Sequence, residues 1–400
     1  MPALAFSAYL LWNFISFERR SYEQQLQQSA IDLSHDIDRD IEGLIVKLST
    51  LATSPSVHRG DLAEFHAQAT EASVDGFNIV VLDLSLQQIV NTLVPYAVLW
   101  YLMYLSLSVS YWLTVPLLLL AGGFLVRVFI IFHDCGHGSF FKSKVANDVM
   151  GMIAGVLCFT PYYRWRWEHA VHHSSSGDLD RRGTGDVWTL TVQEYLEASR
   201  WKRFSYRLAR NPIVLFVLAP LILFVIIERF PNGKGGLRER LSVHLTNLFI
   251  LLVAIGLSRL VGWKAYLIIQ IALVMIAGSA GVWLFYVQHQ FEGAYWERRE
   301  HWDYVKAALQ GSSFYKLPKI LQWFSGNIGF HHIHHLSPRI PNYHLEKCHR
   351  AEPLFHSVKA VTLFSSLKSI GFRLWDEQRG KMVGYSALAG VRGQAETRQR

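Results

Sequence analysis

The sequence carries little charge for its length. Of its 400 residues only 18% are Asp, Glu, Lys or Arg, whereas about a quarter is usual for a soluble protein. The 43 residues from Leu84 to Val126 contain none of the four. As one helix this stretch would measure roughly 64 Å, about twice the ~30 Å hydrocarbon core of a bilayer. Two crossings fit better, and Thr114-Val115-Pro116 is the expected turn. We expect an integral membrane protein.

Cysteine is also scarce. Cys135, Cys158 and Cys348 form no CxxC pair, which argues against a disulfide framework and against a thiolate metal site. The net charge of +8 could suit a nucleic-acid partner, but the basic residues flank apolar segments and form no single polar stripe. Loops beside membrane spans have this distribution. We therefore expect no nucleic-acid binding.

Residues 1–87 differ from the rest and are expected to form a small α/β-like extension. The apolar run Ala3–Phe17 precedes a stretch with helical periodicity, Ser21–Leu51, and Asn78–Asp83 has the composition of a strand. This order resembles the start of the extracytoplasmic sensor module of bacterial sensor kinases. A soluble extension without a catalytic role fits the same pattern.

Residues 88–375 are expected to form the membrane domain, followed by a polar tail at residues 376–400. Two hairpins are predicted, from the segments Leu93–Leu113 with Val115–Phe132 and Leu245–Leu257 with Ala265–Val287. Met150–Tyr163 is too short to span. Pro212–Ile227 has Pro220 at mid-length and basic residues on both sides, so it is expected to lie in the interface or to dip in and return. The expected fold is an all-α membrane protein with four spans, interfacial helices and a histidine-rich cap.

The clustering of histidines indicates a metal site. Half of the 18 histidines fall in three clusters: His133-Asp134-Cys135-Gly136-His137, His169-Ala170-Val171-His172-His173 and His331-His332-Ile333-His334-His335. Helical residues three or four apart share a face, so each cluster directs two or three imidazoles toward one point. Imidazole suits iron, zinc, copper and nickel, so the spacing predicts a metal site without choosing the metal. The isolated histidines are expected to be interfacial or core residues: His35, His58, His66, His244, His301, His344, His349 and His356.

The three clusters, in this order and separated by hydrophobic hairpins, resemble the histidine boxes of the membrane fatty acid desaturase family. The stretch from His173 to Asp180, followed by Asp186-Val187-Trp188, resembles the region after the second box in the Δ12/ω6 subgroup. Gln288-His289-Gln290-Phe291 is similar to the additional histidine of that subgroup, and Gly326–Phe330 leads into the third box as in bacterial members. The resemblance covers residues 88–375.

The resemblance implies a set of iron ligands. They are His133, His137, His169, His172, His173, His289, His331, His334 and His335. His332 occupies the filler position of the third box and is expected beside the ligands. Some animal acyl-CoA desaturases have an Asn that holds a water one helical turn before the additional histidine. Here Phe285 occupies that position, so a water-mediated ligand is in doubt.

The resemblance also implies two non-haem iron ions, O2 as co-substrate and a fatty acyl lipid that receives a cis double bond, in a bacterial inner membrane with the active site facing the cytoplasm. The chain has no haem or flavin motif, so a separate ferredoxin-like or cytochrome b5-like electron donor is implied. A basic set near the second box could bind such a donor or could reflect the positive-inside bias. Its members are Arg164, Arg166, Arg181, Arg182, Arg200, Lys202 and Arg203.

Ligating imidazoles usually donate their other ring N–H to an acceptor, which orients them. Five carboxylates near the boxes are candidates for this role: Asp134, Glu168, Asp178, Asp180 and Asp186. Each could instead be a solvated loop charge.

Three other functions remain open at this stage. A hydroxylase, a ketolase or an alkane monooxygenase uses the same boxes. A membrane sensor with a degenerate enzyme domain is possible because of the N-terminal resemblance, although a decayed site should have lost histidines. A metal transporter would place ligands at mid-membrane depth, whereas these histidines lie at segment ends.

Overall fold

Four long apolar helices dominate the computed structural model, which describes residues 76–389 and their side chains from Leu84 onward. They are α4 (Gly76–Leu107), α5 (Tyr111–His137), α11 (Leu237–Val261) and α12 (Trp263–His289). All four are long and apolar enough to cross a bilayer, α4 through its part Leu84–Leu107. A helix of 25 residues is about 37 Å long, which exceeds the ~30 Å core. The predicted all-α membrane fold with two hairpins is confirmed.

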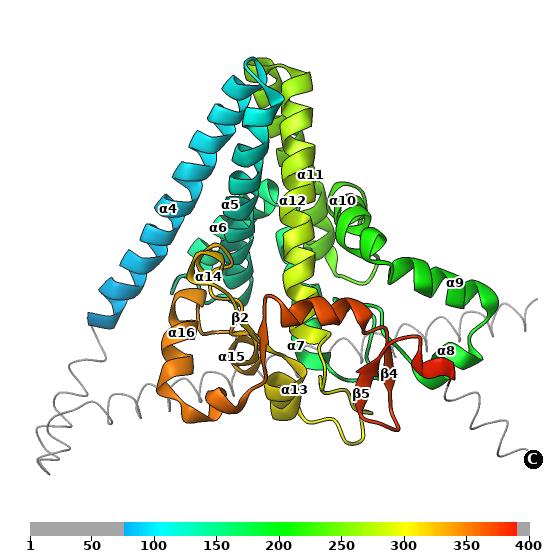
Figure 1. Cartoon of the computed structure of the whole chain (residues 1–400). Coiled ribbons are helices and arrows are strands. Elements are labelled where there is room, and N and C mark those ends of the chain that lie inside the picture. Colours follow the sequence, from blue (N-terminus) through cyan, green and yellow to red (C-terminus); the bar gives the residue numbers. More distant parts are fainter. Residues whose placement is uncertain (1–75, 390–400) are drawn as a thin grey trace, which may run out of the picture. The chain divides into compact units, whose positions relative to one another are not determined.

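Both hairpins turn at the same end. In Figure 1 the α4–α5 turn and the α11–α12 turn lie together at the top, while the C-terminal ends of α5 and α12 point down toward α7 and α15. Gly262, with φ at 85°, makes the second turn, because a left-handed backbone costs glycine little. The histidines that end α5 and α12 therefore lie on one side of the helices.

The first turn does not fall at Thr114-Val115-Pro116, where the sequence predicted it. It falls earlier, because the Ser110 side chain caps α5 by accepting a hydrogen bond from the backbone N–H of Trp112 at 3.2 Å. Pro116 lies inside α5, where it removes one backbone donor. Thr114 Oγ1 lies 2.7 Å from Ser106 Oγ of α4 and joins the two helices near the turn.

The strand predicted at residues 78–83 is also wrong, since these residues belong to α4. Their β-branched residues favour a strand locally, but no Gly or Pro separates them from the apolar run that follows, so the helix begins ahead of the span. The two N-terminal segments predicted at Ala3–Phe17 and Ser21–Leu51 lie outside the described residues.

Two further helix pairs are apolar but sharply bent. Helices α6 (Lys144–Leu157) and α7 (Tyr162–Ser175) meet at 100°. Helix α9 (Arg200–Ala209) meets the segment Val214–Arg229 at 61°, and that segment is divided into η1 (Val214–Leu218), α10 (Ala219–Val225) and η2 (Ile227–Arg229). A Cβ placed on Gly278 of α12 would meet Pro220 Cβ at 3.1 Å, so α10 packs closely against α12. The bend of each pair fits either a broken span or a segment that dips in and returns.

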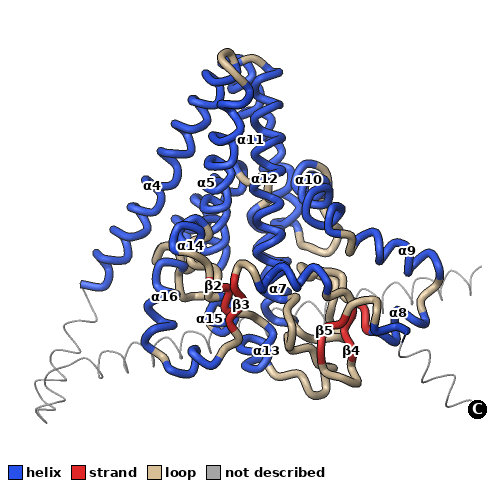
Figure 2. The backbone as a smooth tube through the Cα atoms, in the orientation of Figure 1, coloured by secondary structure: helices blue, strands red, loops and turns tan. Residues whose placement is uncertain are grey.

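The remaining elements form a cap that covers the lower ends of the long helices and extends upward beside α5 (Figure 2). The cap helices are α8 (Val192–Glu197), α13 (Tyr304–Gly311), α14 (Lys319–Phe324), α15 (His331–Leu336), α16 (Asn342–Ala351), η3 (Pro353–Ser357) and η4 (Ser365–Gly371). The strands are β1 (Leu190–Thr191), β2 (Phe314–Lys316), β3 (Ala360–Thr362), β4 (Leu374–Asp376) and β5 (Lys381–Val383).

The strands form two small sheets. In the first, β1 pairs in parallel with β4, which pairs antiparallel with β5. In the second, β2 pairs in parallel with β3. The first sheet continues the packed region past residue 376, at which the polar tail was expected to begin, because Met382, Val383 and Leu388 are buried.

The four-span topology predicts that Ser205 in α9 and Lys234 after η2 lie on the same side of the membrane. Both positions are exposed. Single-cysteine variants S205C and K234C should therefore react equally with a membrane-impermeant maleimide in inside-out vesicles, and neither should react in right-side-out vesicles. Opposite labelling of the two positions would show that Val214–Arg229 spans, and the four-span topology would be wrong.

Candidate metal centre

All nine histidines implied as ligands converge at the lower ends of α5 and α12. His133 and His137 come from the last two turns of α5, His289 ends α12, and the other six lie on α7 and α15. Helix α7 contributes His169, His172 and His173, and α15 contributes His331, His334 and His335. The i, i+3 and i+4 spacings place each set on one helical face.

The imidazoles form two groups with the spacing of metal ligands. In the first group, possible ligand atoms of His133, His137, His169 and His334 all lie within 4.8 Å of one another. In the second group the same holds for His172, His289 and His335. Within the described part of the chain, no other set of three or more His, Cys, Asp or Glu side chains meets this criterion.

The two remaining histidines adjoin one group each. His173 Nε2 lies 3.1 Å from His169 Nε2 and 3.0 Å from His334 Nε2, beside the first group. His331 Nε2 lies 2.9 Å from His289 Nε2, beside the second group. The arrangement thus offers five imidazoles at one position and four at the other.

His332 points away from both groups. It is fully buried, and its ring lies 5.4 Å from the ring of His349 and 5.6 Å from that of Phe355, measured between centroids. His332 is thus adjacent to the implied ligands in sequence but belongs to neither group, as expected for the filler position of the third box. His244, His301, His344, His349 and His356 also lie outside the two groups, and His35, His58 and His66 fall outside the described residues.

Three of the converging imidazoles are held through their outer ring nitrogen. His133 Nδ1 lies 3.0 Å from Asp134 Oδ1, and the other Asp134 oxygen accepts hydrogen bonds from the backbone N–H and side-chain amide of Asn342 at 2.7 and 2.8 Å. His172 Nδ1 lies 2.6 Å from Asp186 Oδ1. His289 Nδ1 lies 3.2 Å from the carbonyl oxygen of Gly311. Two of the five carboxylates that the sequence indicated thus contact a box histidine.

The other three carboxylates have different partners. Asp178 accepts a hydrogen bond from Arg181 Nε at 2.5 Å, and Asp180 accepts one from Arg298 Nη1 at 2.7 Å. Glu168 Oε1 accepts one from Arg164 Nε at 3.1 Å. These carboxylates neutralise arginines of the cap. Asn342 and Gly311, which do support the histidine site, have no motif in the sequence that could have identified them.

The hydrogen-bond partners of His172 and His289 indicate where their ring protons lie, and they leave no proton between the two Nε2 atoms. Carboxylate and carbonyl oxygens accept hydrogen bonds, and these contacts assign the ring protons of His172 and His289 to Nδ1. Their Nε2 atoms then present lone pairs, yet these atoms lie 3.2 Å apart. Two lone pairs at this distance repel each other unless a cation lies between them or beside both.

Burial keeps the third box neutral, as a metal ligand must be. Burial, followed by the charges of neighbouring imidazoles, lowers the pKa of His331, His334 and His335 well below the usual value. For His332 burial is again the main cause, and His349 adds to it, so that its pKa falls to about 3. At neutral pH all four rings are uncharged.

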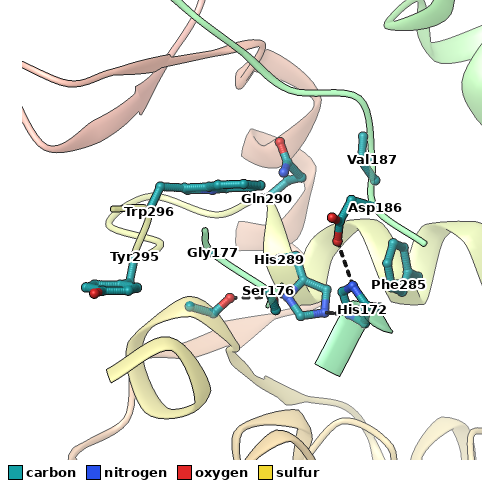
Figure 3. Close-up of a pocket in the computed structure, with 11 residues that line it drawn as sticks. His172, Ser176, Gly177, Asp186, Val187, Phe285, His289, Gln290, Tyr295 and Trp296 are labelled. Atoms are coloured by element: carbon teal, nitrogen blue, oxygen red, sulfur yellow. Dashed lines mark hydrogen bonds and ion pairs between the residues drawn. The ribbon is translucent and has the colours of Figure 1, made fainter. Parts of the chain in front are cut away.

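A cavity opens beside the second group of imidazoles (Figure 3). His172, His289 and Asp186 line one part of it, and Phe285 and Trp296 provide apolar walls. The Phe285 ring lies 5.1 Å from the His172 ring and 5.2 Å from the His289 ring, measured between centroids. Where some animal acyl-CoA desaturases have a water-binding Asn, this chain therefore places the Phe285 ring next to His172 and His289.

The basic set near the second box is largely neutralised inside the protein. Arg164 pairs with Glu168 and Glu228, and Arg166 pairs with Asp148. Arg181 and Arg182 pair with Asp178 and Glu194. Only the α9 members of the set, Arg200, Lys202 and Arg203, have no ion pair among the described residues.

Comparison with known proteins decides the family. The family model described as "Fatty acid desaturase" matches residues 110–361. A protein of Bacillus subtilis named "Fatty acid desaturase" is 52% identical over 305 residues, which is 76% of this chain and 86% of that protein. The chain belongs to the fatty acid desaturase family. It is a desaturase enzyme of the membrane, as the sequence predicted.

More distant desaturase relatives share less of their length. An "sn-1 acyl-lipid omega-3 desaturase (ferredoxin)" of Synechocystis is 29% identical over 262 residues, 60% of this chain and 67% of that protein. An "Omega-6 fatty acid desaturase, chloroplastic" of Arabidopsis thaliana is 25% identical over 236 residues, 56% of this chain and 49% of that protein.

The contact between Asp186 and His172 gives a direct test of the second group. The variant D186N keeps the size of the side chain but removes the charge that holds His172, so we expect metal affinity and desaturation to fall by about 10- to 100-fold. The matched control is D180N, which alters an exposed ion pair with Arg298. Metal content and product should be measured for both. An equal loss of metal and product in D186N and D180N would show that Asp186 does not support metal binding through His172.

Proposed function

We propose that this desaturase introduces a cis double bond, in the manner of the Δ12/ω6 subgroup, into the acyl chain of a membrane lipid at a pair of non-haem iron ions. His133, His137, His169, His173 and His334 would hold one ion, and His172, His289, His331 and His335 the other. O2 is the proposed oxidant, and a separate carrier supplies the electrons. The observation that carries the proposal is the pair of facing Nε2 atoms on His172 and His289.

The donor set fits iron. Nine imidazoles without a carboxylate or thiolate among them form a neutral set, which suits Fe, Zn, Cu or Ni. Desaturation narrows this choice, because removal of hydrogen from an unactivated methylene pair needs a redox metal that can activate O2, and no side chain can replace it. Bound iron would supply this chemistry.

The protein's own residues position the site and protect it. Asp134 and Asp186 fix the ring orientation and the proton position of His133 and His172. Asn342 in turn holds Asp134, so the first box is tied to α16. The rings of α15 are buried, and Phe285 adds an apolar surface beside the second group, which limits the access of water to an oxidising centre.

The active site is proposed to face the cytoplasm of a bacterial cell from the inner membrane. The ends of α5 and α12 that carry the boxes lie on the side of the long basic connection between α5 and α11, and basic connections favour the cytoplasm. Cytosolic reductant is then available to the site.

The names of the relatives support a proposal for the substrate and the electron donor. An acyl chain esterified in a membrane lipid is the proposed substrate, in line with the acyl-lipid desaturase of Synechocystis, whose name also specifies ferredoxin. A ferredoxin-like or cytochrome b5-like protein is the proposed donor for this chain. Arg200, Lys202 and Arg203 of α9 are the members of the basic set that remain available for it.

The histidine proposal predicts that either H172A or H334A abolishes desaturation while membrane insertion remains intact. Each variant removes one ligand from a different group, so iron content should fall in both. H356A, which alters an exposed histidine outside the groups, is the control and should keep full activity. Fatty acids of an expressing host should be profiled by gas chromatography and iron measured on purified protein. Full activity of H172A would exclude that residue from the ligands.

We propose that residues 88–375 form the catalytic domain, which predicts that residues 1–80 are dispensable for desaturation. Deletion of residues 1–80 leaves the apolar stretch Leu84–Leu107 of α4 and the other three long apolar helices complete. A truncated chain expressed at the same level should give at least half of the wild-type product. Complete loss of product in well-inserted truncated protein would show that residues 1–87 are an integral part of the enzyme.

A further inference from the structure

Three arginines meet where α9 ends and the C-terminal sheet packs against it, and none of them has an ion pair among the described residues. Arg207 and Arg210 lie one helical turn apart, and Arg373 directly precedes β4. The guanidinium of Arg373 donates a hydrogen bond to the carbonyl oxygen of Arg210. Arg164, Arg181, Arg182 and Arg298, by contrast, are each paired with a carboxylate. This cluster, which we call the arginine cluster, is a concentration of uncompensated positive charge.

Arg210 is the buried member of the cluster. Only 1% of it is exposed. Its Nη2 atom donates to Gln290 Oε1 and to the carbonyl oxygen of Phe372, both at 2.9 Å, and lies 3.4 Å from the Tyr286 hydroxyl. Its Nε and Nη1 atoms are buried and have no hydrogen-bond partner. A buried guanidinium without a counterion and with unused donors carries a large desolvation cost.

Tyr385 adds a third unused donor. Its ring lies 4.8 Å from the Arg207 guanidinium and 5.5 Å from the ring of Tyr195, and its hydroxyl is buried without a partner. Burial raises the pKa of Tyr385 to about 12, although the charges of Arg210 and Arg373 act in the opposite direction, so the hydroxyl keeps its proton at neutral pH. All three unsatisfied atoms are therefore donors. The missing partner is an acceptor, and the surrounding charge favours an anion.

The cluster lies at an interfacial position. Helix α9 exposes Trp201, Phe204 and Leu208 to 79%, 59% and 50%, and its basic side chains alternate with them. A short helix with an exposed apolar face and basic residues is typical of the membrane surface. The phosphate groups of lipids lie at that depth.

One side chain separates the cluster from the metal centre. Gln290, which accepts the hydrogen bond from Arg210, directly follows His289 and lines the cavity that His172 and His289 also line (Figure 3). A lipid whose head group lies at the cluster would have its acyl ester close to this cavity.

We propose that Arg207, Arg210, Arg373 and Tyr385 bind the phosphate group of a membrane phospholipid. Guanidinium groups match phosphate oxygens with paired N–H donors, and the Tyr385 hydroxyl supplies one donor more. That this phospholipid is the acyl substrate rests on the proposed function. The binding itself does not depend on the metal centre.

Lipid retention by the purified full-length protein tests the proposal without turnover. The protein in mild detergent is incubated with equal amounts of phosphatidylglycerol and monogalactosyldiacylglycerol, and bound lipid is counted by native mass spectrometry. Phosphatidylglycerol should be retained at least tenfold better, because only it carries phosphate. The variants R210K and Y385F should each lose at least tenfold of this retention. Y385F removes only the unpartnered hydroxyl, so a folding defect in R210K alone leaves the test intact.

The control variant is R240Q, which removes an exposed cation of α11 outside the cluster and should retain lipid as the wild type does. Equal retention of both lipids, or unchanged retention in Y385F and in folded R210K, would overturn the proposal. Stabilisation of the wild type by millimolar inorganic phosphate without preferential phospholipid retention would identify free phosphate as the ligand and would also overturn it. Iron content, measured on the same samples, separates this result from a failure of the metal-site proposal.

Discussion

The structure depends on bringing nine imidazoles together from four helices. Each imidazole with its outer proton held by an acceptor turns a lone pair toward its neighbours, as His172 and His289 do at 3.2 Å. Such an arrangement is repulsive in the protein alone and would become favourable with the proposed metal ions in it, which would couple folding of the cap to metal binding. The fixed acceptors on Asp134, Asp186 and Gly311 keep the lone pairs directed inward.

This constraint determines how the membrane helices must run. The imidazoles come from the end of α5, from α7, from the end of α12 and from α15, and these elements can meet only on one side of a bilayer. The number of crossings between α7 and the end of α12 must then be even. The two long helices α11 and α12 supply two crossings, and the break of Val214–Arg229 into three short elements is consistent with a segment that adds none.

The sequence predicted which histidines come together better than it predicted where the helices begin and turn. The spacing of the three boxes is local, because i, i+3 and i+4 positions share a face in any helix. The structure places seven histidines of the implied set in two groups, and His173 and His331 each adjoin one group. Two local predictions were wrong, the turn at Thr114-Val115-Pro116 and the strand at residues 78–83. The Ser110 cap decides where α5 begins, although Pro116 suggested a turn, and the long apolar helix α4 includes the β-branched run. The supporting acceptors Asn342 and Gly311 could not be predicted, because they reach the site through tertiary contacts alone.

Tertiary contacts also separate the arginines that are paired with carboxylates from those that are not. Arg164, Arg166, Arg181 and Arg182 follow or precede the second box in the sequence and suggested a surface for a partner, yet each is paired with a carboxylate. Arg210 is prominent in no motif, and two of its buried donors, Nε and Nη1, remain unused. Charge in a sequence shows where basic residues are concentrated, but only the pairing of each guanidinium shows which of them can hold a ligand. For a membrane enzyme whose substrate is itself part of the bilayer, the proposed phosphate contact of Arg210 would fix the depth at which the acyl chain enters.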